Sequence, residues 1–220
     1  MTTRLAPQTR PAPSIGTPGE APSEASAPGP VTVPIDEQAT LLRLARAALA
    51  AATGQASADV LEAALVAAAG CDEPAAVFVT LTEADDLRGC MGSLIADRPV
   101  SEAVVESAFA AALGDPRFAR LAARELPAVR VDISVLGPQV AIAAPADLRP
   151  GIDGIVVERG RAGALLLPEV AERFHWGGRE MVEAACRKAG LPASAWRDPQ
   201  TRLSVFRTAH FGGPAVEAAA

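Results

Sequence analysis

The alternation of hydrophobic and polar positions divides the chain into a series of short helices and strands. Leucine and alanine recur at helical spacing over residues 36–52, which predicts a helix, and Gly54 follows as a stop signal. A second helix is expected from Ser57 or Asp59, either of which can act as an N-cap, to about residue 69. The segment 75–82 is rich in β-branched residues and is the first predicted strand.

A polar turn over residues 83–86 reverses the chain after this strand, and the return segment runs through Leu94, so the pattern predicts a β-hairpin. Apolar positions at helical spacing then predict a helix over 100–113, which Gly114 ends, and alternation predicts a strand over 129–136. The remaining expected elements are a hairpin over 153–167, a short helix beginning near Pro168, a helix over 179–189 and a last strand over 202–211.

This order of elements indicates an α+β protein. Strands joined by short hairpin turns and interrupted by helices predict a single compact domain with a largely antiparallel or mixed sheet flanked by helices. The turns are too short for the crossover connections that a doubly wound parallel sheet needs. The domain is expected over residues 35–212.

Two terminal zones are expected to lie outside this domain. In residues 1–34, prolines alternate with Ser, Thr, Ala and Gly, and no aromatic residue occurs. Such a segment cannot bury enough apolar surface to offset its ordering entropy, so we expect a disordered tail. A proline motif that docks to a partner is the alternative. Residues 213–220 are expected to form a short flexible C-terminus.

The charge and composition narrow the function classes. The net charge is −6, and an acidic surface repels phosphate backbones, so nucleic-acid binding is disfavoured. The alanine-rich stretches carry charges and are too short to span a bilayer, so no membrane segment is expected. Lys188 is the only lysine among the 20 lysine and arginine residues. We interpret this bias as the base composition of the gene rather than as arginine-based recognition.

The cysteines indicate a reducing compartment. Cys71, Cys90 and Cys186 are widely spaced and form no disulfide framework, and no signal peptide is recognised, so a cytoplasmic location is expected. The cysteines and histidines show none of the spacings of a metal site, and the glycine segments 151–154 and 160–163 match no phosphate-binding loop. The sequence therefore predicts neither a metal nor another cofactor.

The segment over residues 87–92 is the strongest candidate site, because it holds Cys90 between Gly89 and Gly92. Glycine lets another chain or a ligand approach closely. The guanidinium of Arg88 would favour the thiolate, which is the reactive form of cysteine. Cys90 is therefore a candidate nucleophile, with a packed structural cysteine and a ligand or partner contact as the alternatives. A dyad with His175 or His210, the only histidines, is disfavoured, because nothing in the sequence supplies the geometry that it requires.

A second polar group follows the helix over 100–113. Asp115, Arg117 and Phe118 form a turn, and Glu125 comes shortly after it. These side chains are candidates to line a cleft beside Cys90 and to bind a polar ligand. The alternative is a salt bridge that only fixes the turn.

At this point the sequence resembles the AMMECR-one domain family, called protein A of the AmmeMemoRadiSam system in prokaryotes. Residues 87–92 are similar to the family's hallmark Leu-Arg-Gly-Cys-Ile-Gly, with Met91 in place of the isoleucine. Further segments match in the family's order: 77–81, 111–118, 125–127, 133–136, 148–155, 167–170 and 186–191. The resemblance spans about residues 38–210 and implies a compact α+β fold, often encoded beside Memo-like and radical-SAM proteins.

The resemblance implies no settled activity, and whether the chain is an enzyme stays open. We expect a binding or accessory component that acts with Memo-like and radical-SAM partners, in which Arg88, Gly89, Cys90 and Gly92 shape a recognition groove for a partner or a small-molecule ligand. The alternative is a cysteine-dependent enzyme acting on a small metabolite. In that case Cys90 is the nucleophile, Arg88 its electrostatic activator and Glu125 a proton shuttle.

Overall fold

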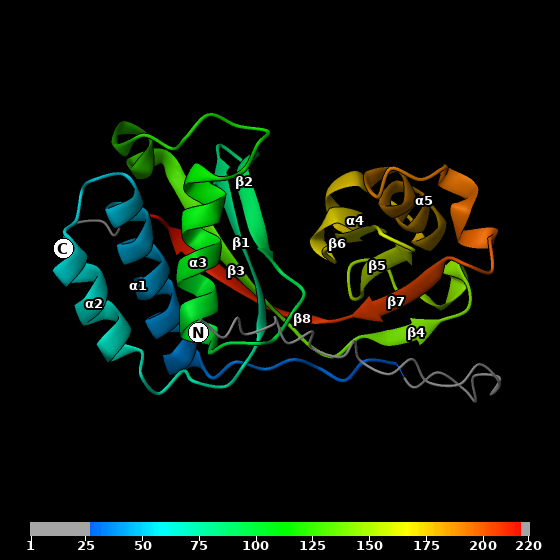
Figure 1. Ribbon diagram of the computed structural model, residues 1–220, viewed down its shortest axis with the longest axis horizontal. Coiled ribbons are helices and arrows are strands. Elements are labelled where there is room, and N and C mark those ends of the chain that lie inside the picture. Colours follow the sequence, from blue (N-terminus) through cyan, green and yellow to red (C-terminus); the bar gives the residue numbers. More distant parts are fainter. Residues whose placement is uncertain (1–26, 217–220) are drawn as a thin grey trace, which may run out of the picture.

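The computed structural model describes residues 27–216, which form two four-stranded sheets and the helices that cover them (Figure 1). The strand order is β2-β1-β3-β8 in the first sheet and β4-β7-β5-β6 in the second, and every pairing is antiparallel. The helices are α1 (Ile35–Ala52), α2 (Ala58–Ala67), α3 (Val100–Leu113), α4 (Glu169–Phe174) and α5 (Gly178–Lys188). The strands are β1 (Ala76–Glu83), β2 (Asp86–Ser93), β3 (Val129–Leu136), β4 (Val140–Ile142), β5 (Gly154–Arg159), β6 (Ala162–Leu166), β7 (Arg202–Phe206) and β8 (Thr208–Pro214).

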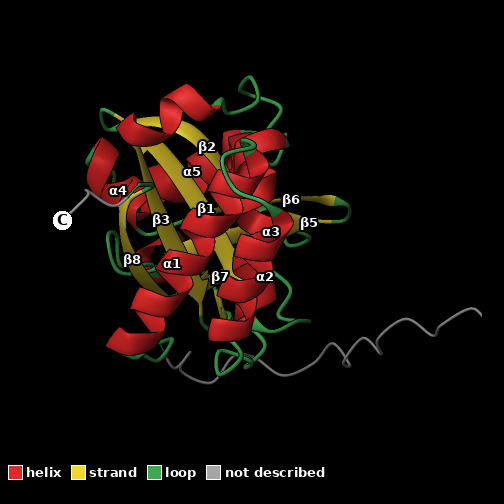
Figure 2. Ribbon diagram, turned by 90° about the vertical axis from the view of Figure 1, so that its left-hand side faces the viewer, coloured by secondary structure: helices red, strands yellow, loops and turns green. Residues whose placement is uncertain are grey.

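Helices α1 and α3 cover one face of the first sheet, and α2 packs against α1 (Figure 2). The buried residues of α1 recur at helical spacing and form its apolar stripe: Leu41, Leu44, Ala45, Ala48 and Leu49. Most of the buried residues of α3 are small, which lets the helix lie close to the sheet. The buried residues of α1 and α3 and the inward side chains of β1 and β3 together form the largest core of the described residues.

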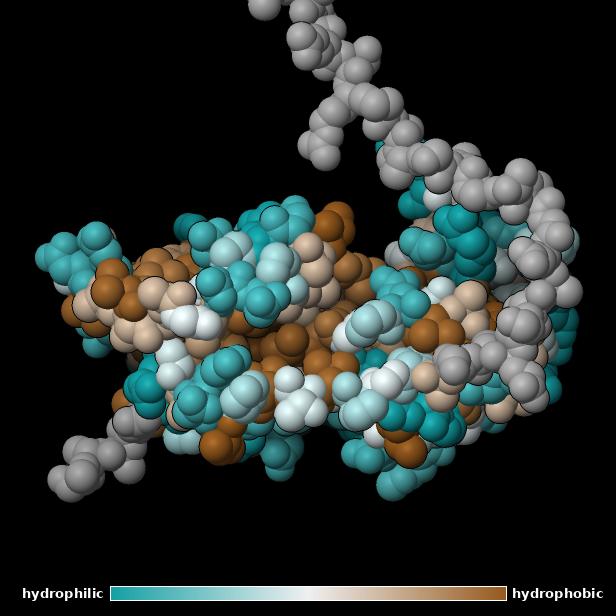
Figure 3. Space-filling view, turned by 90° about the horizontal axis from the view of Figure 1, so that it is seen from below, coloured by the Kyte–Doolittle hydropathy of each residue, from teal (hydrophilic) through white to brown (hydrophobic). Residues whose placement is uncertain are grey.

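The second sheet has a smaller core of its own beneath α5. Met181, Val182, Ala185 and Cys186 of that helix are buried against the apolar side chains of β5 and β7. A third apolar cluster joins the two halves, because Ala76 and Leu136 of the first sheet meet side chains of the second sheet in it. Seen from below, apolar surface gathers towards the middle of the molecule, where the halves meet (Figure 3). The α+β class and the single compact domain are therefore confirmed.

The prediction of a single last strand is wrong. Hydropathy predicts one strand over 202–211, but the chain forms two, β7 in the second sheet and β8 in the first. The change of sheet falls at Arg207, whose carbonyl accepts the backbone N–H of Gly137 and whose Nε lies 3.4 Å from the carboxylate of Asp153. The predicted strand runs through Arg207 without a turn signal, so periodicity alone does not reveal the crossing. The short strand β4 was also not predicted.

Residues on both sides of the predicted domain limits of 35 and 212 pack against the domain. On the N-terminal side, Val33 packs against the main core. On the C-terminal side, β8 pairs through Pro214 with Arg130, and Ala215 is buried and donates its N–H to the carbonyl of Val129. The rest of the predicted tails, residues 1–26 and 217–220, lies outside the described residues. None of the described helices combines the length and apolar character needed to cross a membrane.

Candidate functional site

Cys90 lies on the face of the first sheet that is turned away from α1 and α3. Its neighbour Gly89 faces α3, since a Cβ added at Gly89 would overlap the carbonyl of Ala111. Successive strand residues point to opposite faces, so the Cys90 side chain points towards the second half of the molecule. It lies opposite Thr80 of β1, and the Thr80 hydroxyl donates to Cys90 Sγ at 3.3 Å.

Strand β2 is an edge strand, and the turn after α3 covers its edge at Cys90. The backbone N–H of Cys90 donates to Asp115 Oδ2 at 2.9 Å, and Arg117 Nη2 donates to the Cys90 carbonyl at 3.3 Å. Arg117 also donates to Asp115 from Nε and Nη2, at 2.9 and 2.6 Å. The Asp115–Arg117 pair therefore takes the place of a neighbouring strand and fixes the backbone at Cys90. The Asp115 carboxylate is buried, and Arg117 with the two backbone N–H donors holds its pKa far below the usual value.

The thiol itself is held in its neutral form. Burial raises the pKa of Cys90, and the charge of Glu169 acts in the same direction. The Thr80 hydrogen bond and the charges of Lys188 and Arg117 lower the pKa but do not outweigh the burial. At neutral pH the group is therefore a thiol, which is a hydrogen-bond donor and a weak nucleophile.

The two charges that reach Cys90 from the second half of the molecule were missed by the sequence reasoning. Glu169 begins α4 and Lys188 ends α5. Lys188 is exposed as a whole residue, but its amine donates to the carbonyl of Leu165 at 3.0 Å in a part-buried position, and desolvation lowers its pKa. The signal in the sequence is that Lys188 is the only lysine, which base composition also explains.

The predicted site residues of the first sheet and the turn come together along β2. Arg88 forms a two-point ion pair with Glu125, with Nε at 2.8 Å from Oε1 and Nη2 at 3.3 Å from Oε2. The ring of Phe118 contacts both arginines, with the guanidinium carbons of Arg88 and Arg117 6.0 and 5.4 Å from its centroid. Arg88 is thus directed to Glu125, while the cations that act on the Cys90 thiol are Lys188 and Arg117. One nitrogen of Arg88, Nη1, is buried without a partner.

The close approaches that the two glycines allow are made by the protein itself. A Cβ at Gly92 would overlap the carbonyl of Val77 and come within 2.7 Å of Phe78. Gly89, as described above, lets α3 lie on β2. Both glycines therefore hold the strand in place, and Cys90 between them is positioned by this packing and by the hydrogen bonds at the strand edge.

A second polar cluster on the same sheet face was not predicted. Ser134 Oγ lies 3.1 Å from His210 Nδ1, and the two ring nitrogens of His210 lie 3.8 Å from carboxylate oxygens of Asp132 and Glu169. Ser134 is 1% exposed, so its hydroxyl is closed off from solvent, whereas the side chains of His210 and Glu169 are 42% and 38% exposed. Strands β1 and β3 lie between Cys90 and His210, which separates them by about 14 Å. The other histidine, His175, is exposed at the end of α4, so the structure forms no dyad with Cys90.

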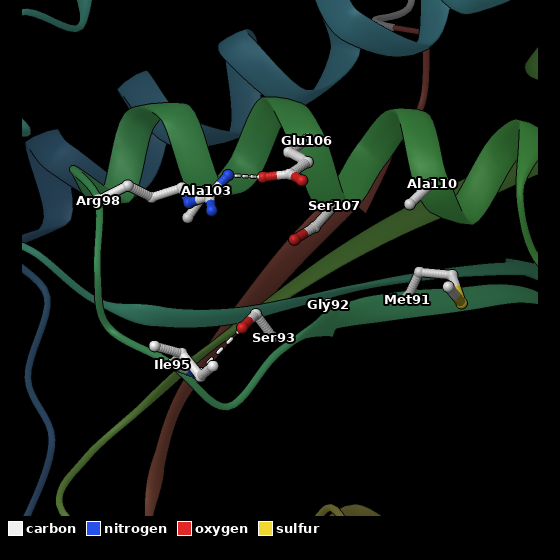
Figure 4. A pocket seen from close by; sticks show the side chains of 9 residues that line it. All are labelled: Met91, Gly92, Ser93, Ile95, Arg98, Ala103, Glu106, Ser107 and Ala110. Carbon is white, nitrogen blue, oxygen red and sulfur yellow. Dashed lines mark hydrogen bonds and ion pairs between the residues drawn. The ribbon is translucent and has the colours of Figure 1, made fainter. Parts of the chain in front are cut away.

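A cavity of about 240 Å³ lies on the other side of β2, between this strand and α3 (Figure 4). Met91 rises from the strand towards α3, and the Arg98 guanidinium reaches Glu106 at the rim. Because Met91 and Cys90 are adjacent strand residues, the cavity does not include the thiol. In the part of the chain that the structure describes, no three Cys, His, Asp or Glu side chains are placed to hold a metal ion.

Comparison with known proteins agrees with this arrangement. The AMMECR1 family model matches residues 42–211. A protein of Methanothermobacter thermautotrophicus is 43% identical over 141 residues, which cover 61% of this chain and 73% of that protein. A protein of Methanocella arvoryzae is 36% identical, over 66% of this chain and 80% of its own length. The crystal structure of an uncharacterised Pyrococcus horikoshii protein superimposes with a TM-score of 0.71 and 31% identity, covering 83% of this chain and 95% of the other. The chain belongs to the AMMECR1 family.

Proposed function

We propose that this protein is a binding or accessory component whose recognition surface is the Cys90 face of the first sheet, and that it acts with Memo-like and radical-SAM proteins. The observation that carries the proposal is the state of Cys90. Its thiol is neutral and accepts a hydrogen bond from Thr80, and its backbone is held at both polar atoms by Asp115 and Arg117. A rigid, protonated thiol suits the recognition of a ligand better than attack on one.

A cysteine-dependent enzyme would need a thiolate and a proton carrier beside it. Glu125, the expected proton shuttle, accepts from Arg88 and from the backbone N–H of Ala122, and both bonds lower its pKa. A carboxylate held in this way is a poor proton acceptor near neutral pH. The surroundings of the thiol therefore favour binding over nucleophilic catalysis.

The first test is the rate at which each cysteine is alkylated by iodoacetamide as a function of pH, read by peptide mass spectrometry on the native full chain. We expect Cys90 to react slowly and to gain reactivity only above the ~8.5 of an ordinary thiol. The buried Cys71 and Cys186 serve as internal controls for unfolding. Fast alkylation of Cys90 with an apparent pKa well below that value would favour the enzyme instead.

The second test addresses the partners, which enter the proposal through the family resemblance. The full chain is titrated with the Memo-like and radical-SAM proteins of its own organism by sedimentation velocity. We expect a complex with at least one of them, weakened in Arg117→Ala and unchanged in Arg120→Ala, an exposed arginine in the same loop. The proposal fails if neither protein binds, or if the chain alone turns over a metabolite and loses this activity in Cys90→Ala.

A further inference from the structure

Helix α2 carries an apolar surface that the rest of the described chain leaves open. All of its residues except Asp59 and Glu62 are apolar, yet it alone among the described helices has no buried residue. It packs against α1 and lies at the outer edge of the molecule (Figure 1). Val60 and Val66 are 51% and 70% exposed. A helix that is apolar nearly all round is normally buried, so this open face indicates a binding surface.

A cavity of about 530 Å³ lies beside the C-terminal end of α2, and we call it the α2–α3 groove. Its apolar lining comes from α2, the turn after it and the residue before α3: Leu65, Val66, Ala69 and Pro99. Two backbone hydrogen bonds join the segments on its two sides, from the Ser101 N–H to the Cys71 carbonyl at 3.3 Å and from the Val100 N–H to the Glu73 carbonyl at 3.0 Å. The groove is therefore formed by segments that are bonded to each other.

The rim of the α2–α3 groove is acidic. Asp72 and Glu102 are the charged side chains that line it, and none of the described residues around it is basic. The sequence has no lysine or arginine between Arg46 and Arg88, so α2 and the turn after it carry only negative charge. An apolar cavity with carboxylates at its edge favours an occupant that is apolar at its centre and cationic beside it.

The cation that stands next to this rim in the sequence does not neutralise it. Arg98 immediately precedes Pro99, and its guanidinium is ion-paired with both Asp97 and Glu106. These two carboxylates carry two negative charges against the single positive charge of Arg98. The balance around the start of α3 therefore stays acidic.

The same charges argue against a second copy of this chain as the occupant. A two-fold contact would place the acidic rim of one copy against the identical rim of the other, where like charges repel. A helix that carries lysine or arginine beside an apolar face meets no such repulsion. Ala63 and Ala67 are exposed on α2 next to Val66, and side chains this small let a second helix lie close.

We propose that the α2–α3 groove is a docking site for a basic amphipathic helix of a partner protein. The apolar face of that helix lies along α2 and fills the cavity, and its lysines or arginines face Asp72 and Glu102. Helices α1 and α3 cover the face of the first sheet opposite to Cys90, and α2 packs outside them. The groove is thus a second interaction surface, and it goes beyond the proposed function of the Cys90 face.

The probe is a synthetic amphipathic helix of leucine and lysine, labelled with fluorescein and titrated with the full chain at physiological salt by anisotropy. The same helix with glutamate in place of lysine is the control peptide, and we expect only the basic one to bind. Val66→Arg puts a charge into the cavity and is expected to weaken binding about tenfold or more. Val60→Arg adds the same charge at an exposed position of α2 outside the cavity lining, and it is expected to bind nearly as well as the wild type.

The acidic rim is tested with a second matched pair. Glu102→Gln is expected to weaken binding of the basic peptide about two- to fivefold, because it removes one carboxylate of the groove. Glu62→Gln removes an exposed carboxylate of α2 that does not line the groove, and little change is expected. Circular dichroism establishes that all four variants are folded.

Three results overturn the inference. The first is equal binding of the acidic and basic peptides, or equal weakening by Val66→Arg and Val60→Arg. The second is a dimer of the chain alone in sedimentation equilibrium that Val66→Arg dissociates, because the groove then takes a second copy. The third is tighter peptide binding when Arg4 and Arg10 are both replaced by glutamate, because the groove then takes the chain's own N-terminal segment.

Discussion

Replacing Asp115 by alanine is expected to cost far more stability than replacing Arg117, although the two side chains form one ion pair. The Arg117 side chain is 50% exposed and that of Asp115 is 2% exposed. Arg117→Ala removes the half-exposed partner, whose place water can take, and leaves the Asp115 carboxylate its two backbone N–H donors, so we expect a loss of about 1–2 kcal/mol. Asp115→Ala also removes the acceptor for the backbone N–H groups of Cys90 and Arg117. Each hydrogen bond to a charged group is worth about 1.5–3 kcal/mol, so the two backbone bonds together predict a loss of about 3–6 kcal/mol.

The assay is urea unfolding at neutral pH, followed by the fluorescence of Trp176 and Trp196. The free energy of unfolding is compared among wild type, Asp115→Ala and Arg117→Ala. Asp97→Ala is the matched control, because Asp97 is an exposed carboxylate paired with Arg98, and its loss is expected to leave the free energy of unfolding nearly unchanged. Equal losses in Asp115→Ala and Arg117→Ala would refute the view that Asp115 holds the strand edge.

The same carboxylate predicts a pH dependence. The pKa of Asp115 is lower in the folded protein than its ordinary value of 3.8, so its contribution is complete above that pH. Between the ordinary and the folded pKa, the unfolded chain binds a proton that the folded chain does not, and stability falls as the pH falls. Asp115→Asn is expected to flatten the stability curve below about pH 4. If the stability of Asp115→Asn falls below pH 4 as steeply as that of the wild type, Asp115 is not the group that causes the fall.

Two further substitutions test the backbone around the motif, both by the same unfolding assay. Gly89→Ala would place a methyl group against the Ala111 carbonyl, so we expect it to lower the free energy of unfolding by about 1–3 kcal/mol. Gly163→Ala, also in a strand, is the control: its methyl group would lie 3.6 Å from the Val157 carbonyl oxygen, an ordinary contact, so we expect little change in stability. Ala84 occupies the left-handed region at φ 48° in the β1–β2 turn, so Ala84→Asn is expected to stabilise by about 0.5–1 kcal/mol, and a loss of stability would contradict this.

The local elements were predictable because local forces specify them. The helix over 100–113 and the strand over 129–136 have strong periodicity, and both occur at those limits. The β1–β2 hairpin follows from a β-branched strand and a polar turn. The division into two sheets was not predictable, because β7 and β8 continue one pattern and only Arg207 separates them. A strand's hydropathy reports that one of its faces is buried, but not which other strand it pairs with.

The candidate site shows the same limit at the level of chemistry. The residues that the sequence singled out do gather along β2, because a turn after α3 brings Asp115, Arg117 and Phe118 back to the strand edge. Their pairing was not predictable. Arg88, two positions from Cys90, was the expected activator of the thiol, yet it reaches along the strand to Glu125. A long side chain joins the partner that best satisfies its planar donors, and the carboxylate of Glu125 offers two oxygens where the thiol offers one sulfur.

The charges that set the state of the thiol come instead from the second half of the molecule. The charges of Lys188 and Glu169 act on the pKa of Cys90 from the other half, and the third apolar cluster joins the two halves. The electrostatics of the site therefore depends on the packing between the halves. A substitution that loosens this cluster, such as Leu136→Ala, should move the pKa of Lys188 back towards its ordinary value, because the amine regains water. Because Lys188 is the only lysine, NMR of protein labelled with ¹⁵N at the lysine side-chain nitrogen gives one resonance, which reports its pKa. An unchanged pKa in a folded Leu136→Ala variant would show that Lys188 is shielded by its own helix alone.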